Sequence, residues 1–289
     1  MPDRRSRHDV RGSGPVLLIL PGGAGHPMGL EGATARLAER FTVVTSDPLG
    51  LSLGPLDGPV GEQRVEAWSD GAHRLLDSLL PDDESAYVFG SSSGGIVALD
   101  LLARHPRRLR HVVAHEPPSL AVLPDAARQR AMIDEVDEIG RARGLGAAMA
   151  RLQAGLVGGT WDGPPAFVPE VDPDTPMGVF LTRVLRPFTT HIPDLPALKS
   201  LSARLTLGAG HDSRGQLPYR AAALLAELSG GDFAEFPGGH LGVIEHPVTF
   251  ADRLTALFTG AAEGTRGLSV GSDGATARRR ASRAPRRAT

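Results

Sequence analysis

Five consecutive residues, Gly90-Ser91-Ser92-Ser93-Gly94, have the types and spacing of a nucleophile elbow. In such an elbow a buried strand turns sharply into a helix, and the central serine stands at the tip of the turn. Glycines flank the serine because any side chain there would collide with the neighbouring strand or helix. This arrangement serves nucleophilic attack on a carbonyl carbon, so Ser92 is the candidate nucleophile.

The pattern needs support from its surroundings, because the chain has 36 glycines among its 289 residues. Upstream, residues 86–89 form a short apolar run that suits a buried strand. Downstream, residues 95–104 have the apolar spacing of a helix, which ends where Pro106 forbids continuation. A strand, a tight turn and a helix are what a nucleophile elbow requires, and a Gly/Ser-rich connecting loop is the alternative.

A nucleophilic serine needs a general base. The segment FPGGHLG places His240 on a glycine-rich loop just past the last predicted strand. Such a loop can bring an imidazole back over the sheet edge. Of the ten histidines, His105 and His246 each precede a proline and have the context of helix-end or turn residues. His240 is therefore the candidate base.

The base in turn needs a carboxylate to orient it. Asp212 follows a predicted strand at residues 204–207, and sites in open α/β sheets gather at the carboxyl ends of strands. Glu116, in the segment HEPP after a predicted strand at residues 111–114, is the alternative acid. We expect Asp212 to orient His240, with the chain order Ser92, Asp212, His240, although Asp212 could also be a simple turn residue.

The oxyanion formed by attack on a carbonyl needs preorganised N–H donors. The backbone N–H of Ser93, at the start of the helix after the nucleophile, is one candidate. The second is the backbone N–H of Gly23, in the glycine-rich segment LILPGGAGHP that follows the first long strand. A turn punctuated by glycines is the alternative interpretation of that segment.

The candidate site residues must be positioned by strands and helices, which alternate along the chain. This alternation predicts an α/β fold with a mostly parallel central sheet and helices on both faces. The predicted strands are residues 15–20, 42–45, 86–89, 111–114, 204–207 and 232–236, with 8–11 as a possible partner strand, and the predicted helices are 30–40, 65–80, 95–104, 218–228 and 248–258. Residues 1–116 and 199–260 would form this core.

Residues 117–198 break the alternation and predict a helical lid or cap inserted after the strand at about 111–115. We expect one long amphipathic helix at about 125–156, followed by a Pro/Gly-rich stretch. An ordinary core-facing helix fits the same spacing equally well. Trp161, Phe167 and Phe180 favour an apolar substrate. Residues 261–289 are rich in Gly, Ser, Ala and Arg, which predicts a disordered tail.

Composition excludes several classes of protein. There is no cysteine, which rules out disulfides, thiolate catalysis and Cys-ligated zinc. The net charge of −2 shows no bias toward nucleic acid. No apolar stretch is long enough to span a membrane, and no secretory signal is apparent. We expect a cytoplasmic, bacterial protein with a small-molecule substrate and no cofactor, metal, nucleic acid or membrane partner. The oligomeric state stays open.

The segments LILPGG, SDPLGLS, GSSSGG, GAGHD and FPGGHLG together resemble the α/β-hydrolase fold family. The resemblance implies a Ser-His-acid hydrolase with a lid after the sixth strand of the family's sheet. It places Ser92, Asp212 and His240 on the triad positions, and Gly23 and Ser93 on the oxyanion positions. The chain departs from the family where D-x-R-G-x-S is expected, since Leu49 stands in place of the arginine.

The expected reaction is cleavage of an ester, lactone or thioester through an acyl-enzyme on Ser92. An enzyme of natural-product metabolism acting as a cyclase, C–C bond hydrolase or perhydrolase is the alternative within the fold. A non-catalytic ligand-binding protein is the alternative from another class.

Overall fold

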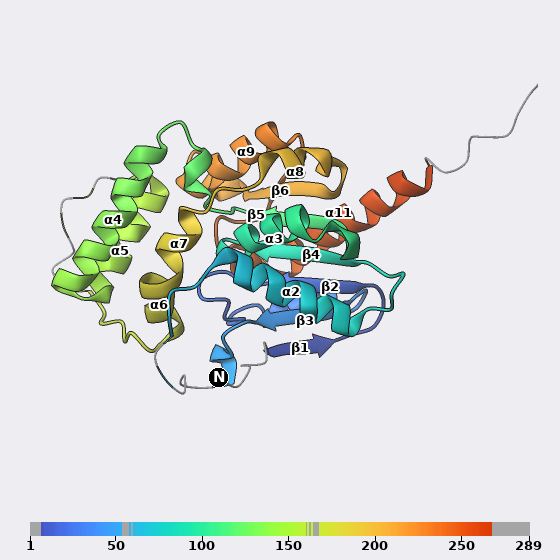
Figure 1. The fold of residues 1–289 in the computed structure, drawn as a ribbon, viewed down its shortest axis with the longest axis horizontal. Helices are drawn as coiled ribbons and strands as arrows, with labels where there is room; N and C mark the ends of the chain where they lie inside the picture. The colour runs from blue at the N-terminus through green and yellow to red at the C-terminus, as the bar shows by residue number, and fades with distance from the viewer. Residues whose placement is uncertain are drawn as a thin grey trace, which may run out of the picture.

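The computed structural model describes residues 7–53, 58, 60–159, 161, 163 and 168–267. Seven strands form one sheet in the order β1-β3-β2-β4-β5-β6-β7 (Figure 1). The strands are β1 (Arg7–Arg11), β2 (Val16–Leu20), β3 (Thr42–Asp47), β4 (Ala86–Ser91), β5 (Leu109–His115), β6 (Leu205–Gly210) and β7 (Asp232–Phe236). The edge strand β1 pairs antiparallel with β3, and every other pair is parallel. This confirms the predicted fold class.

The central strands are apolar because both faces of the sheet are covered. All residues of β4 are buried, as is typical of a parallel strand with helices on both sides. In β2, Leu18 and Leu20 belong to one apolar cluster, whereas Leu17 and Ile19 belong to the other. Alternate residues of a strand point to opposite faces, so these two clusters are the two halves of the core.

Helices pack on each face of the sheet. The first cluster includes residues of α2 (Val65–Leu79), α3 (Ser93–Arg104) and α9 (Leu217–Ser229). The second includes residues of α1 (Glu31–Leu37) and α11 (Pro247–Gly267). A short helix, α10 (Gly242–Glu245), precedes α11. The nucleophile elbow lies at the junction of β4 and α3.

Between β5 and β6 the chain forms a group of helices beside the sheet (Figure 1). They are α4 (Ala126–Arg143), α5 (Leu145–Val157), α6 (Pro176–Val179) and α7 (Leu185–Thr189), with a π-helical stretch at Phe180–Val184 between α6 and α7. The last helix before β6, α8 (Leu195–Ser200), lies over the sheet near α9 (Figure 1), and its Leu198 belongs to the first cluster.

The prediction of a single long helix at about 125–156 is wrong. Gly144 interrupts it, with φ +89° and ψ 161°, a backbone conformation that glycine tolerates and a helix does not contain. The two helices that result, α4 and α5, pack against each other. Ile133 and Val136 from α4 share a buried apolar cluster with Ala148 and Leu152 from α5.

The final helix continues to Gly267, so residues 261–267, which were expected to be disordered, belong to α11. The rest of the predicted tail, 268–289, lies outside the described residues. None of the helices in the described part of the chain has the length and apolar character to cross a membrane.

Candidate active site

Ser92 stands between the last residue of β4 and the first residue of α3. Its φ of 54° and ψ of −120° are unusual for a residue with a side chain, as expected at a strained elbow. The flanking glycines are needed for close packing. A Cβ on Gly94 would lie 2.0 Å from the carbonyl oxygen of Leu20, and one on Gly90 would lie 2.3 Å from the carbonyl oxygen of Gly94. Local sterics therefore hold the Ser92 side chain at the carboxyl edge of the sheet.

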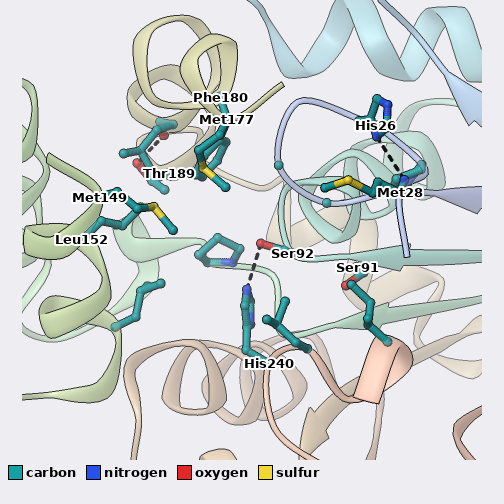
Figure 2. Close-up of a pocket in the computed structure, with 18 of the residues that line it drawn as sticks. His26, Met28, Ser91, Ser92, Met149, Leu152, Met177, Phe180, Thr189 and His240 are labelled. Atoms are coloured by element: carbon teal, nitrogen blue, oxygen red, sulfur yellow. Dashed lines mark hydrogen bonds between the residues drawn. The ribbon is translucent and has the colours of Figure 1, made fainter. Parts of the chain in front are cut away.

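His240 lies on the loop between β7 and α10 and reaches back to the elbow. Gly238, two residues earlier, has φ +77°, and a Cβ there would lie 2.8 Å from the Cα of Gly242. This tight turn brings Nε2 of His240 to 3.1 Å from Oγ of Ser92 (Figure 2). The two residues predicted as nucleophile and base are thus within hydrogen-bond distance.

The carboxylate that contacts His240 belongs to Glu116. This residue directly follows β5, has φ +45° and is fully buried. Its Oε2 lies 2.7 Å from Nδ1 of His240. Its Oε1 accepts hydrogen bonds from the backbone N–H of Gly210, at 2.9 Å, and from the hydroxyl of Ser213. Both carboxylate oxygens are therefore held in place.

The protonation of this pair follows from its contacts. Burial by itself would raise the pKa of the Glu116 carboxyl, but the hydrogen bond and charge of His240 oppose it and bring the pKa below its ordinary value of 4.5. An ionised carboxylate only accepts hydrogen bonds. Nδ1 of His240 is therefore the nitrogen that donates to Glu116. In the neutral form of the ring, this leaves Nε2 as the nitrogen that can accept the hydroxyl proton of Ser92.

The prediction that Asp212 orients His240 is wrong, and the alternative acid, Glu116, has that place. Asp212 lies just past β6, and its side chain is 62% exposed. Its carboxylate contacts His211 Nδ1 at 2.7 Å, and its backbone N–H donates to the carbonyl of Gly238. The Glu116 carboxylate occupies the space between the ends of β5 and β6, while the side chain of Asp212 is directed to solvent.

The segment that contains Gly23, which was expected to supply an oxyanion donor, lies against the elbow. A Cβ on Gly22 would approach the Cβ of Ser92 to 3.2 Å. The hydroxyl of Ser93 donates a 2.7 Å hydrogen bond to the carbonyl oxygen of Gly23. The two residues expected to supply oxyanion N–H groups are thus joined directly to each other, next to Ser92.

A cavity of about 220 Å³ opens beside Ser92 and His240. Apart from the histidines, the serines and Thr189, the residues that line it are apolar or glycine. On the wall formed by the helices between β5 and β6, Thr189 is polar and the apolar residues are Ile133, Met149, Leu152, Leu156, Met177, Phe180 and Leu185. Figure 2 shows Met149, Leu152, Met177 and Phe180 around the space in front of Ser92.

Of the three aromatic residues expected to favour an apolar substrate, Phe180 lines this cavity. Trp161 is not among the lining residues, and its ring lies under the guanidinium of Arg151 at 5.6 Å. Phe167 lies outside the described residues.

The opposite wall of the cavity was not predicted from the sequence. It is formed by Met28 from the loop after β2 and by Leu241, Val243 and Ile244 from the loop and helix after His240. Met28 is 70% exposed and Leu241 is 53% exposed. The only sequence signal for these four residues was their closeness in the chain to Gly23 and His240.

No cluster of three or more His, Cys, Asp or Glu side chains suited to a metal ion occurs in the described part of the chain. The site instead brings together the Ser92 hydroxyl, the His240 imidazole and the buried Glu116 carboxylate at an apolar cavity. That arrangement can activate a hydroxyl group as a nucleophile.

Comparisons with known proteins agree with this geometry. The family model described as "Alpha/beta hydrolase family" matches residues 16–253. An uncharacterized hydrolase of Bacillus subtilis, YraK, is 31% identical over 272 residues, which cover 88% of this chain and 92% of YraK.

Two solved structures are similar to this fold. One is from a study of carboxylesterases of the thaumarchaeon Nitrososphaera gargenis (TM-score 0.66, 17% identity, 90% of this chain and 96% of the other). The second is a thermophilic esterase from Thermogutta terrifontis (TM-score 0.61, 17% identity, 91% of this chain and 93% of the other).

Proposed function

Because this chain belongs to the alpha/beta hydrolase family, we propose that it is a serine hydrolase that cleaves an uncharged carboxylic ester through an acyl-enzyme on Ser92. The observation that carries the proposal is the chain of contacts from Ser92 Oγ through His240 to Glu116, at 3.1 and 2.7 Å. Lactones and thioesters undergo the same acyl-transfer chemistry and belong to the same proposal.

In the first half of the reaction, Oγ of Ser92 attacks the carbonyl carbon while Nε2 of His240 takes the hydroxyl proton. The imidazolium that forms is stabilised by the buried carboxylate of Glu116. In the resulting tetrahedral intermediate, the bond between the carbon and the alkoxy oxygen of the ester then breaks. His240 returns the proton to the leaving alkoxide, so an alcohol departs and the acyl group stays on Ser92.

The negative charge on the tetrahedral intermediate requires donors, for which we assign the backbone N–H groups of Gly23 and Ser93. Ser93 is the first residue of α3, and the first N–H groups of a helix have no partner within the helix. The helix dipole also favours negative charge at this end. Gly23 is adjacent, joined to Ser93 by the 2.7 Å hydrogen bond.

In the second half, water replaces the alcohol. His240 takes a proton from water as its oxygen attacks the acyl carbon, and the same donors hold the new oxyanion. Collapse of that intermediate breaks the bond to Ser92, whose oxygen recovers its proton from His240, and the carboxylic acid leaves.

The cavity lining limits the substrate. The lining contains no Arg, Lys, Asp or Glu among the described residues, so a charged group inside the cavity would lose its hydration without gaining a charged partner there. The apolar wall from the helices between β5 and β6 suits a hydrocarbon acyl group, and we propose that these helices form the lid that selects it. A substrate with apolar groups near the carbonyl therefore fits best.

The test is covalent labelling with a fluorophosphonate, followed by intact-mass measurement and peptide mapping. We expect one adduct on Ser92 in the wild type, none in Ser92→Ala and none in heat-denatured wild type. Hydrolysis of p-nitrophenyl esters should depend on Ser92 in the same way. Absence of both labelling and ester hydrolysis would refute the proposal and favour a non-catalytic ligand-binding protein. Ester hydrolysis that survives in Ser92→Ala would refute the acyl-enzyme.

A further inference from the structure

The hydroxyl of Ser93 makes a contact that the proposed reaction does not use. It donates to the carbonyl oxygen of Gly23 at 2.7 Å, across 70 positions in the chain. Ser93 is 2% exposed, so water has little access to replace this hydrogen bond. The contact joins the first residue of α3, beside the nucleophile, to the loop after β2.

Gly23 itself has no side chain to pack, although the next residue of the loop, Ala24, is buried at 2% exposure. Gly23 has φ +59°, and within the described part of the chain no atom lies within 4 Å of the position that a Cβ would occupy. A glycine in open space can change its backbone angles at low cost. The peptide before it is held, because the carbonyl of Gly22 accepts from the N–H of Gly25 at 3.0 Å. The peptide after it is held through its carbonyl by Ser93.

We infer that the Ser93 side chain is a positioning group, which holds the Gly23 loop so that the two oxyanion N–H groups keep a constant separation. Ser93 would then act twice, by donating its own N–H and by anchoring the residue that carries the other one. The inference rests on the proposed function, since it concerns the oxyanion site of that reaction.

This role should affect catalysis more than substrate binding. The donors of an oxyanion site act on charge that is present only in the tetrahedral state, so their misplacement raises the activation barrier. Removing one donor outright costs on the order of 10²- to 10³-fold in kcat. Loosening a donor should cost less, and we expect about a 10- to 100-fold loss of kcat from Ser93→Ala, with KM changed less than about threefold.

The experiment compares wild type, Ser93→Ala and Ser93→Thr, which retains a hydroxyl group. The control is Ser69→Ala, because Ser69 is a fully buried serine on α2 whose hydroxyl has no hydrogen-bond partner among the described residues. Two competitive inhibitors with the same acyl chain are measured against each variant. One is a trifluoromethyl ketone, which forms a tetrahedral adduct with the nucleophile. The other is the planar amide.

The positioning role predicts that Ser93→Ala weakens binding of the trifluoromethyl ketone by the same factor as it lowers kcat. Affinity for the amide and the melting temperature should change little. Ser69→Ala should match the wild type, and Ser93→Thr should recover activity if its methyl group is accommodated. The comparison of the two inhibitors does not depend on that recovery.

A wild-type kcat in Ser93→Ala, or equal weakening of both inhibitors, would overturn the inference while leaving the proposed function intact. If the wild type itself neither labels nor hydrolyses esters, the proposed function and this inference fall together.

Discussion

Nδ1 of His240 lies 2.7 Å from Oε2 of Glu116, although the two residues are 124 positions apart. Glu116 follows β5 and His240 follows β7, and β6 lies between these strands in the sheet. The Glu116 carboxylate reaches the end of β6, where its other oxygen accepts from the N–H of Gly210, the last residue of that strand. This contact distinguishes the two candidate acids and leads to the first prediction.

Glu116→Gln should lower kcat by on the order of 10³- to 10⁴-fold, since an amide in place of the carboxylate no longer stabilises the imidazolium and favours the wrong ring tautomer. Asp212→Asn should leave kcat within about twofold of the wild type, because its side chain is exposed and does not contact His240. Steady-state hydrolysis of p-nitrophenyl butyrate measures both. The reverse ranking of the two variants would show that Asp212 is the working acid.

His115 should make the protein less stable in mild acid. Its ring is fully buried against Phe236 and Phe250, neither ring nitrogen has a partner within the described residues, and burial lowers its pKa from 6.5 to about 4. Between these pH values the unfolded chain binds the proton and the folded chain does not. The free energy of unfolding therefore falls as pH drops from about 6.5 to about 4, by up to about 3 kcal/mol from this residue.

Urea unfolding between pH 8 and pH 4.5 tests this prediction. His115→Leu should show a shallower loss of stability than the wild type over that interval. The control variant is His8→Leu, whose side chain is exposed on β1, and it should keep the wild-type profile. Parallel profiles for wild type and His115→Leu would contradict the assignment.

Gly94→Ala should unfold the protein or prevent soluble expression. The added Cβ would meet the carbonyl oxygens of Leu20 and Pro21 at 2.0 and 2.5 Å, and both are backbone atoms of the core. Such overlap requires the elbow to separate from β2, with an expected loss above about 4 kcal/mol. Gly61→Ala is the control, since no atom of the described residues lies within 4 Å of its added Cβ. The denaturant midpoints of unfolding of the two variants test this prediction. Similar midpoints would refute the steric argument.

Met149→Trp should shorten the acyl chains that the enzyme accepts. Met149 lines the cavity from α5, and a larger side chain there would fill part of a space of only about 220 Å³. We expect kcat/KM for p-nitrophenyl octanoate to fall by on the order of tenfold, because steric differences in an apolar pocket change substrate discrimination by a few kcal/mol at most. The value of kcat/KM for the acetate ester should change little. Val157→Trp, on the exposed part of the same helix, should leave both unchanged. Equal losses for acetate and octanoate would place the acyl group elsewhere.

Much of this site follows from local patterns. The steric requirement for glycines around Ser92 involves residues close to it in sequence. The elbow and its two flanking elements could therefore be predicted. The same holds for His240, because its glycine-rich loop is a local feature. The apolar runs predicted the six parallel strands of the sheet, since buried parallel strands must be apolar on both faces. The exposed edge strand β1 has no such run, and residues 8–11 were predicted only as a possible partner strand.

The interruption at Gly144 shows where pattern reasoning fails. The apolar spacing continues through this glycine at helical intervals, so periodicity alone predicted one helix. A lone glycine is compatible with a helix at a modest cost. Packing of α4 against α5 makes the break favourable, because the folded-back pair buries Ile133, Val136 and Leu152 in one cluster.

By itself, the sequence determined the candidate nucleophile, the candidate base, the glycine segments beside them and the fold that holds them. Only the tertiary structure decided which carboxylate meets His240, which side chains enclose the cavity and that the Ser93 hydroxyl holds Gly23. Both Glu116 and Asp212 follow strands that end at the same sheet edge, so their positions in the chain do not separate them. The direction of each side chain does, and it depends on contacts between segments far apart in sequence, such as the hydrogen bonds from Gly210 and Ser213 that hold the Glu116 carboxylate beneath the imidazole.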